Sequence, residues 1–256
     1  MSANLAGKKG LIIGMANKDS IAYGCARQCK AAGATIAATY LNAKAEQYVK
    51  PLADEVGAEL FLPCDVMVPG QLEAVFEAVD KKWGKLDFLI HSIAFSPLAD
   101  LHGRVVDCSL EGFKMAMDVS CHSFIRMAKL SEPLMKDGGA LITMSYDGAN
   151  TVIPNYNMMG PVKAALESTT RYLAMELAEK RIRALVVSPG PMRTRAASGI
   201  KGFNELVELA EKKVPHYEEM NIDDIGAVTA FLVSDAARSL NGYTYYVDHG
   251  LSLIGI

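Results

Sequence analysis

The chain has 256 residues, of which 50% are hydrophobic and 21% charged, a composition and length typical of a soluble α/β protein with a large core. A formal net charge of -3, with no apolar run near the roughly 20 residues of a membrane span, argues against nucleic-acid and membrane partners. The five cysteines form no CxxC pair, the five histidines have no ligand spacing, and no signal peptide is evident. We therefore expect a reduced, cytoplasmic protein without a metal site.

Short apolar runs alternate with longer amphipathic segments, and no linker or repeat divides the chain. The apolar runs predict strands at Gly10–Gly14, Thr35–Tyr40, Leu60–Pro63, Leu86–Ser92, Ala140–Ser145, Arg183–Ser188 and Thr244–Val247. The amphipathic segments predict helices at Ser20–Ala32, Ala43–Val56, Pro69–Trp83, Leu110–Lys136, Met159–Lys180, Phe203–Lys213 and Ile222–Ser234. We expect a single α/β domain over residues 1–256, a Rossmann-type doubly wound parallel sheet of seven strands with helices on both faces.

The turn after the first predicted strand has the features of a phosphate-binding turn. Gly14 lets the backbone pass close to a pyrophosphate, and Ser20 can cap the following helix while its N-terminal amides meet an anion. Gly24 allows this helix to pack closely on the sheet. The spacing is not GxGxxG, so an ordinary strand-to-helix turn is the alternative interpretation.

The ends of the second and third strands bear on the choice of nucleotide. Around Leu41 there is neither an acidic residue for an adenosine ribose nor an arginine for a 2′-phosphate, which favours NADH over NADPH. Leu41 could also simply cover the adenosine. Asp65 could accept a hydrogen bond from an adenine amino group with Val66 against the ring, or it could cap the helix near Pro69. Both roles are compatible.

Two polar residues further along, His91 and Ser120, are weaker candidates for a role at the site. His91, at the end of the fourth strand, is more typical of a structural histidine whose hydrogen bonds are satisfied than of a functional one. The small residues Ser92 and Ala94 leave room for a flat ring. Ser120, within the long apolar helix that follows, could hold the backbone near the active centre.

The catalytic prediction centres on Tyr146, Tyr156 and Lys163, which follow the fifth strand. Seven residues make almost two helical turns, so on a helix Tyr156 and Lys163 project from nearly the same face. A tyrosine hydroxyl beside an ammonium can donate a proton to a substrate oxygen, and the ammonium would lower the tyrosine pKa. A tyrosine merely packed at a helix N-terminus is the alternative.

The sixth strand is followed by a long excursion that we expect to form a substrate-binding lid at about residues 191–217. Thr194 and nearby amides can reach a phosphate, and Ile200, Phe203 and Leu206 offer an apolar surface. A surface helical hairpin without a role is the alternative. The apolar C-terminal segment, Leu251–Ile256, is expected to pack against another subunit.

Taken together, these features resemble the short-chain dehydrogenase/reductase superfamily and, within it, the bacterial NADH-dependent enoyl-(acyl-carrier-protein) reductases. The motifs that carry the resemblance span nearly the whole chain: Gly14-x5-Ser20-Ile21-Ala22-x-Gly24, CDV at 64–66, HSIAF at 91–95, SY at 145–146, IPNYNxMGPxKAALE at 153–167, PGPxRTxAASGI at 189–200 and the final VDxGxS. The spacing of Tyr156 and Lys163 is the most specific of them, because most of the superfamily has the lysine four residues after the tyrosine. That position is Gly160 here.

The resemblance implies that NADH reduces a trans-2-enoyl-(acyl-carrier-protein) to the saturated acyl thioester, in fatty acid biosynthesis, in a cytoplasmic homotetramer. It implies that Tyr156 donates the proton and stabilises the oxyanion, that Lys163 holds the nicotinamide ribose, and that Tyr146 assists. The implied cofactor-binding residues are Gly14, Ser20, Ile21, Leu41, Asp65, Val66, Ile93, Lys163, Met192, Arg193, Thr194, Arg195 and Ala196. The implied substrate-binding residues are Ser96, Tyr146, Tyr156, Ile200, Phe203 and Leu206.

Three positions depart from the family pattern without removing a catalytic group. Leu41 replaces a polar residue at the adenosine ribose, Asp147 replaces an apolar residue after Tyr146, and His249 replaces a glycine. Other functions remain open: an enoyl reductase for coenzyme A esters, a 3-ketoacyl-carrier reductase, and a non-catalytic dinucleotide sensor. The tyrosine–lysine spacing disfavours the ketoreductase.

Overall fold

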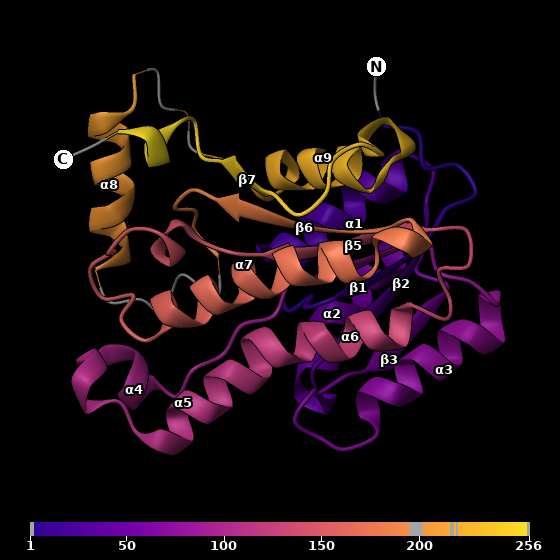
Figure 1. The fold of residues 1–256 in the computed structure, drawn as a ribbon, viewed down its shortest axis with the longest axis horizontal. Helices are drawn as coiled ribbons and strands as arrows, with labels where there is room; N and C mark the ends of the chain where they lie inside the picture. The colour runs from indigo at the N-terminus through magenta and orange to yellow at the C-terminus, as the bar shows by residue number, and fades with distance from the viewer. Residues whose placement is uncertain (1–2, 195–201, 216–217, 219, 255–256) are drawn as a thin grey trace.

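Seven parallel strands form one sheet through the centre of the molecule (Figure 1). The computed structural model describes residues 3–194, 202–215, 218 and 220–254. The strands are β1 (Lys9–Ile13), β2 (Thr35–Tyr40), β3 (Leu60–Pro63), β4 (Phe88–His91), β5 (Gly139–Met144), β6 (Ile182–Pro189) and β7 (Thr244–Val247). Their order is β3-β2-β1-β4-β5-β6-β7, and every pairing is parallel. The sequence-based prediction of a doubly wound, seven-stranded parallel sheet is confirmed.

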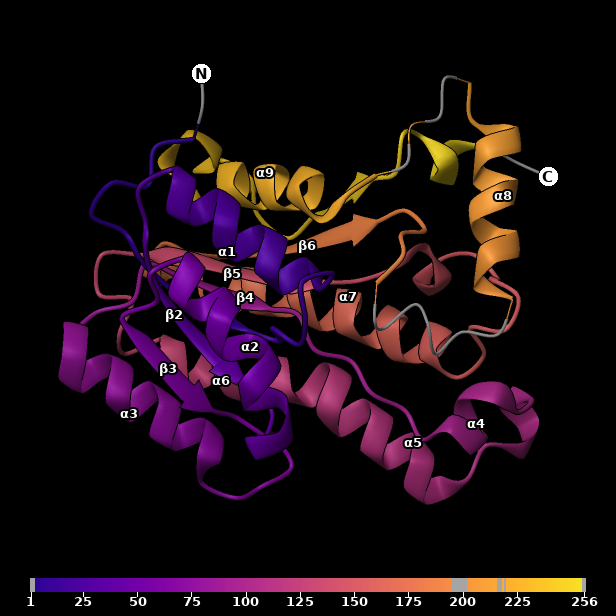
Figure 2. The same ribbon diagram turned by 180° about the vertical axis from the view of Figure 1, so that it is seen from behind.

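Helices cover both faces of this sheet (Figures 1 and 2). The helices are α1 (Ile21–Ala31), α2 (Ala43–Glu55), α3 (Gln71–Trp83), α4 (Leu98–His102), α5 (Leu110–Met117), α6 (Ser123–Ser131), α7 (Met159–Glu176), α8 (Phe203–Lys213) and α9 (Ile222–Val233). One buried apolar cluster joins the sheet to α1, α2 and α9, and a second joins it to α3, α6 and α7. Consecutive residues of a strand enter different clusters, as with Leu11 and Ile12. This explains why apolar residues follow one another along the inner strands instead of alternating with polar ones.

The prediction of one continuous helix at Leu110–Lys136 is wrong. It is interrupted after α5 by a π-helical turn at Asp118–His122 and ends with α6 at Ser131. The sequence gives no clear sign of the interruption, because no glycine or proline marks it. The short helix α4 was also not predicted. None of the described helices is long and apolar enough to cross a membrane.

The tight packing of α1 has a different partner from the predicted one. A Cβ atom on Gly24 would lie 2.1 Å from the carbonyl oxygen of Ile222, and one on Gly226 would lie 2.4 Å from the carbonyl oxygen of Gly24. The two glycines therefore bring α1 against α9, which run side by side in Figure 2. Gly24 permits close packing between two helices rather than between helix and sheet.

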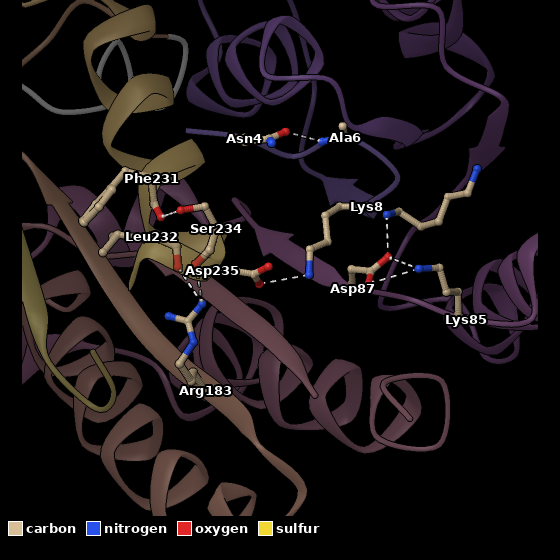
Figure 3. Close-up of polar contacts among 11 residues, drawn as sticks. Asn4, Ala6, Lys8, Lys85, Asp87, Arg183, Phe231, Leu232, Ser234 and Asp235 are labelled. Atoms are coloured by element: carbon tan, nitrogen blue, oxygen red, sulfur yellow. Dashed lines mark hydrogen bonds and ion pairs between the residues drawn. The ribbon is translucent and has the colours of Figure 1, made fainter. Parts of the chain in front are cut away.

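Polar side chains close the end of the sheet where the strands begin (Figure 3). Arg183, at the start of β6, donates to the carbonyl oxygens of Leu232 at 2.8 Å, Leu240 at 3.3 Å and Ser234 at 3.4 Å. These carbonyls lie at and beyond the end of α9, where backbone acceptors have no helical partner. Asp87 accepts from the backbone N–H of Lys9 at 2.7 Å. These hydrogen bonds therefore link the start of β6 to the end of α9, and the start of β1 to the residue before β4.

We expect Arg183→Met to destabilise the protein by about 2–3 kcal/mol, because buried carbonyl groups would lose a charged donor. Urea unfolding followed by circular dichroism measures this free energy. Arg238→Met is the matched control, since Arg238 is exposed, and it should change the free energy by less than about 0.5 kcal/mol. Equal effects of the two substitutions would contradict the assigned role of Arg183.

Candidate active site

The three predicted catalytic residues lie at the carboxyl end of β5. The aromatic rings of Tyr146 and Tyr156 meet edge to face, with centroids 5.0 Å apart. Lys163, in the second turn of α7, donates from Nζ to the carbonyl oxygen of Met144, the last residue of β5, at 2.7 Å. Tyr156 and Lys163 are buried, with exposed fractions of 7% and 4%. The structure thus brings all three residues to one strand end.

Tyr156 does not lie on a helix, so the expectation that it shares a helical face with Lys163 is wrong. The helix α7 begins at Met159, and Tyr156 belongs to the turn before it. Its two neighbours, Asn155 and Asn157, have φ angles of 62° and 44°, in the left-handed region that asparagine tolerates better than most residues. This irregular backbone, rather than helical periodicity, orients the Tyr156 ring.

Two glycines make room for the tyrosine turn. A Cβ atom on Gly148 would lie 2.3 Å from Cδ1 of Tyr156, so any side chain there would displace the ring. A Cβ atom on Gly160 would lie 2.9 Å from the carbonyl oxygen of Gly148. A lysine at position 160 would therefore push the loop away from Tyr156. The glycine that replaces the common lysine position is also a steric requirement of this site.

The electrostatics of the tyrosine differ from the sequence-based expectation. Burial, the charge of Tyr146 in its ionised form and Glu167 all raise the pKa of Tyr156 above its ordinary value, whereas a lowered value was expected. Burial lowers the pKa of Lys163 to about 8, against the opposing influence of Cys121 and Glu167. Tyr156 therefore keeps its proton throughout the neutral range and can act as a hydrogen-bond donor.

The turn after β1 has the shape expected for a phosphate-binding turn but not the expected cap. Gly14 has a φ of 117°, and a Cβ atom there would lie 2.1 Å from the carbonyl oxygen of Ser92. Ser20 occupies the N-cap position of α1 but makes no side-chain capping bond. Its hydroxyl donates to the carbonyl oxygen of Asn17 at 2.7 Å instead. Ser20 thus closes the turn and leaves the first amides of the helix uncapped by its side chain.

Asp65 does not cap a helix near Pro69, contrary to one of its two predicted roles. The helix α3 begins at Gln71 with Gly70 as its N-cap. The Asp65 carboxylate accepts from the backbone N–H of Met67 at 2.9 Å, and its own N–H donates to the Gln71 side chain at 2.8 Å. Asp65 is held in a tight turn beyond β3, next to the buried Val66.

The remaining predicted cofactor residues lie at or just beyond strand ends. Leu41 follows β2 and is 51% exposed, and Ile93 follows β4 and packs against the core. Ile21 begins α1. Met192 is buried, and its carbonyl oxygen accepts from the N–H of Thr194 at 2.9 Å. Arg193 is exposed between them, whereas Arg195 and Ala196 lie outside the described residues.

The π-helical turn places Ser120 against the segment that follows β4. The Ser120 hydroxyl accepts from the backbone N–H of Phe95 at 3.0 Å and donates to its carbonyl oxygen at 3.2 Å. This confirms that Ser120 holds backbone near the site. Next to Phe95, the predicted substrate residue Ser96 is buried, with its hydroxyl 3.3 Å from the carbonyl oxygen of Pro97.

His91 is a structural residue, as expected. It is fully buried, with Nδ1 2.7 Å from the Thr143 hydroxyl and Nε2 2.9 Å from the Ser123 hydroxyl. Burial and the nearby Lys163 charge lower its pKa to about 3. The imidazole is therefore neutral at physiological pH and takes no part in proton exchange.

The helix α8 stands over the carboxyl edge of the sheet, beside the C-terminal turn at Leu251–Leu253 (Figure 1). Its bounds, Phe203–Lys213, match the predicted helix. Leu206 is half-buried on it. Ile200 and the side chain of Phe203 lie outside the described residues.

Comparison with known proteins agrees with this arrangement. A family model described as enoyl-(acyl carrier protein) reductase matches residues 14–252. The enoyl-(acyl-carrier-protein) reductase (NADH) 2 of Rhizobium meliloti (strain 1021) is 41% identical over 253 residues, which are 99% of this chain and 94% of that protein. The chain belongs to the enoyl-(acyl carrier protein) reductase family. The matched residues include the turn after β1, the tyrosine–lysine centre and α8.

Solved structures of the family superpose over the whole chain. The reductase of Anaplasma phagocytophilum in complex with NAD has a TM-score of 0.95 and 41% identity, covering 100% of this chain and 98% of that one. The Bacillus cereus reductase with NADP+ and an indole naphthyridinone has a TM-score of 0.96 and 37% identity, with both chains covered completely. The fold is therefore that of this reductase family.

Glu167 was not among the site residues predicted from the sequence, although it is the last residue of the motif at 153–167. Its carboxylate is buried and accepts from Ser145, Asn150 and Thr244. An acidic residue one helical turn after a predicted catalytic lysine was the available signal. The backbone also explains why the family pattern has glycine at position 249. His249 has a φ of 54°, in the left-handed region that glycine adopts most easily.

Proposed function

We propose that this protein reduces the C2–C3 double bond of trans-2-enoyl thioesters carried by acyl carrier protein, with NADH as the hydride donor. This is the last reductive step of the type II fatty acid elongation cycle. The observation that carries the proposal is the paired Tyr146 and Tyr156 rings at the end of β5, with buried Lys163 bonded to the same strand end, in a member of this reductase family.

The residues after β1 fit a dinucleotide. Gly14 has a backbone that only glycine adopts easily and no side chain to keep a phosphate away, and Ser20 leaves the first amides of α1 uncapped. Lys163 would hold the nicotinamide ribose. Ile21, Leu41, Asp65, Val66, Ile93 and residues 192–196 would surround the remainder. When bound, NADH supplies the hydride that adds at C3.

Tyr156 is the proposed donor to the substrate. Its hydroxyl hydrogen bonds to the thioester oxygen and stabilises the negative charge that develops there as C3 is reduced, before C2 takes a proton. One such donor in a buried site stabilises the transition state by about 3–4 kcal/mol. Tyr146 packs edge to face with the Tyr156 ring and would face the same substrate.

NADH is the proposed cofactor rather than NADPH. In the sequence, no arginine stands next to Leu41, which is exposed, to meet a 2′-phosphate, and the related Rhizobium meliloti enzyme is named for NADH. The family also includes a structure with NADP+, so the comparison of both cofactors belongs in the first assay.

Residues 191–217 are proposed as the substrate lid of a single domain that spans residues 1–256. Within the described part, α8 stands at the carboxyl edge of the sheet, where ligands of such folds bind. Leu206 from α8 and Ser96 would contact the acyl thioester, together with Ile200 and Phe203. The apolar lid would keep water from the reacting carbons.

The protein is proposed to act in the cytoplasm as a homotetramer. Large apolar side chains are exposed on its surface: Tyr172 (72%) and Met175 (75%) on α7, Leu110 (66%) on α5, and Leu253 (88%) near the C-terminus. Apolar surface gathered on helices is typical of subunit interfaces. Size-exclusion chromatography with light scattering gives the subunit number.

A direct assay tests the proposed reaction. We expect NADH oxidation with a trans-2-enoyl-(acyl-carrier-protein), slower turnover with the coenzyme A ester, and slower turnover again with NADPH. Absorbance at the NADH band, with product analysis by mass spectrometry, measures all three. Turnover of a 3-ketoacyl thioester in place of the enoyl substrate would contradict the proposal, and cofactor binding without turnover would indicate a sensor.

A further inference from the structure

A buried carboxylate lies under the proposed centre. Glu167 is 5% exposed and sits one turn of α7 after Lys163. Its Oε1 atom accepts from the Ser145 hydroxyl at 2.6 Å, and its Oε2 atom accepts from the Thr244 hydroxyl at 3.2 Å and from Asn150 Nδ2 at 3.4 Å. All three partners donate, which suits a carboxylate. Buried acidic side chains are rare without such partners.

These contacts hold both ends of the loop that carries Tyr146. Ser145 directly precedes Tyr146, and Asn150 follows the short 3-10 turn at Asp147–Ala149. Asn150 also donates to the Tyr246 hydroxyl at 2.8 Å, which ties the loop to β7. Glu167 thus connects α7, the Tyr146 loop and β7 at one point. The ring of Tyr146 in turn contacts Tyr156.

The same carboxylate acts on the charge of Lys163. Glu167 and Cys121 raise the lysine pKa against the effect of burial. His91 on β4 is neutral, and Asp147 accepts from the Thr151 hydroxyl at 2.7 Å. Tyr156, in the turn before α7, keeps its proton in the neutral range.

We propose that Glu167 is a positioning residue of the reductase, which fixes the Tyr146 loop and keeps the Lys163 ammonium charged for the cofactor. It touches neither reacting atom in this role and acts through its two neighbours. The inference rests on the proposed enoyl reductase activity.

The test compares Glu167→Gln and Glu167→Asp with the wild-type enzyme. For each, kcat/KM for NADH is measured from pH 6 to 10 at saturating enoyl thioester, since this ratio reports the essential groups of the cofactor-free enzyme. With Gln, we expect the alkaline limb to move to lower pH by about one unit, because Lys163 loses a neighbouring charge. With Asp, we expect the limb to stay in place while kcat falls about tenfold, because the shorter side chain keeps the charge but not all contacts.

Thr244→Val is the matched control, since it removes one donor and leaves the carboxylate and Tyr146 in place. We expect an unchanged pH profile for this variant. A wild-type profile for Glu167→Gln would overturn the charge role, and a wild-type kcat for Glu167→Asp would overturn the loop role. If the Gln variant does not fold, the Asp variant alone decides, and its wild-type kcat overturns the proposal. Absence of enoyl reduction by the wild-type enzyme would instead contradict the proposed function.

Discussion

Tyr156→Phe is expected to lower kcat for enoyl reduction by about 10²–10³-fold while NADH affinity stays within about twofold of the wild type. The substitution removes the one hydroxyl proposed to stabilise the developing oxyanion, a contribution of this size in comparable sites. The phenyl ring keeps the shape that packs against Gly148 and the edge-to-face contact with Tyr146. Steady-state kinetics with a trans-2-enoyl thioester and fluorescence titration with NADH measure the two effects separately.

Tyr48→Phe is the matched control for this prediction, because Tyr48 lies on α2 with its side chain 58% exposed. It should leave kcat unchanged. Loss of NADH binding in Tyr156→Phe, with normal folding by circular dichroism, would show that Tyr156 holds the cofactor instead of the substrate oxygen. Full activity would show that another donor meets the thioester.

Lys163→Met is expected to weaken NADH binding by at least about tenfold, because a charged donor to the ribose hydroxyls is lost. The methionine side chain has a similar length and fills the buried space without a charge. Isothermal calorimetry or fluorescence titration with NADH gives the dissociation constant. An unchanged dissociation constant would contradict the assigned contact.

The same variant should also change the pH dependence of stability. Burial lowers the pKa of Lys163 from 10.5 to about 8, so between these values the unfolded chain binds a proton that the native protein has released. Wild-type stability relative to Lys163→Met therefore rises with pH over this window, by about 3 kcal/mol. Below pH 8 the buried ammonium destabilises the native protein, and the methionine substitution removes this destabilisation. Urea unfolding of both proteins from pH 7 to 10.5 tests this difference, and parallel curves would contradict the lowered pKa of Lys163.

The strands were predictable because they obey a simple local rule. The inner strands are short, mostly apolar runs in which neighbouring residues face opposite covered faces, as Leu11 and Ile12 do. The helices with one apolar face were predictable for the same reason, as with α8, whose bounds match the prediction. The break between α5 and α6 was not predictable, because no glycine or proline marks the π-helical turn at Asp118–His122.

The site was predictable in its membership and less so in its geometry. The positions of Tyr146, Tyr156 and Lys163 at one strand end follow from the end of β5. The turn that holds Tyr156 does not, since it depends on asparagines at positive φ and on Gly148 against the ring. The direction of the Tyr156 pKa was misjudged because burial cannot be read from spacing.

By itself, the sequence determines the alternation of strands and helices, the identity of the catalytic groups and the glycine that replaces the usual lysine position, because these depend on residues near one another in the chain. Only the tertiary structure decides how Glu167 reaches Ser145, 22 positions away, and Thr244, 77 positions away. Hydrogen bonds across such separations depend on how α7 packs on the sheet. The charge of Lys163 and the orientation of the Tyr146 loop follow from that packing.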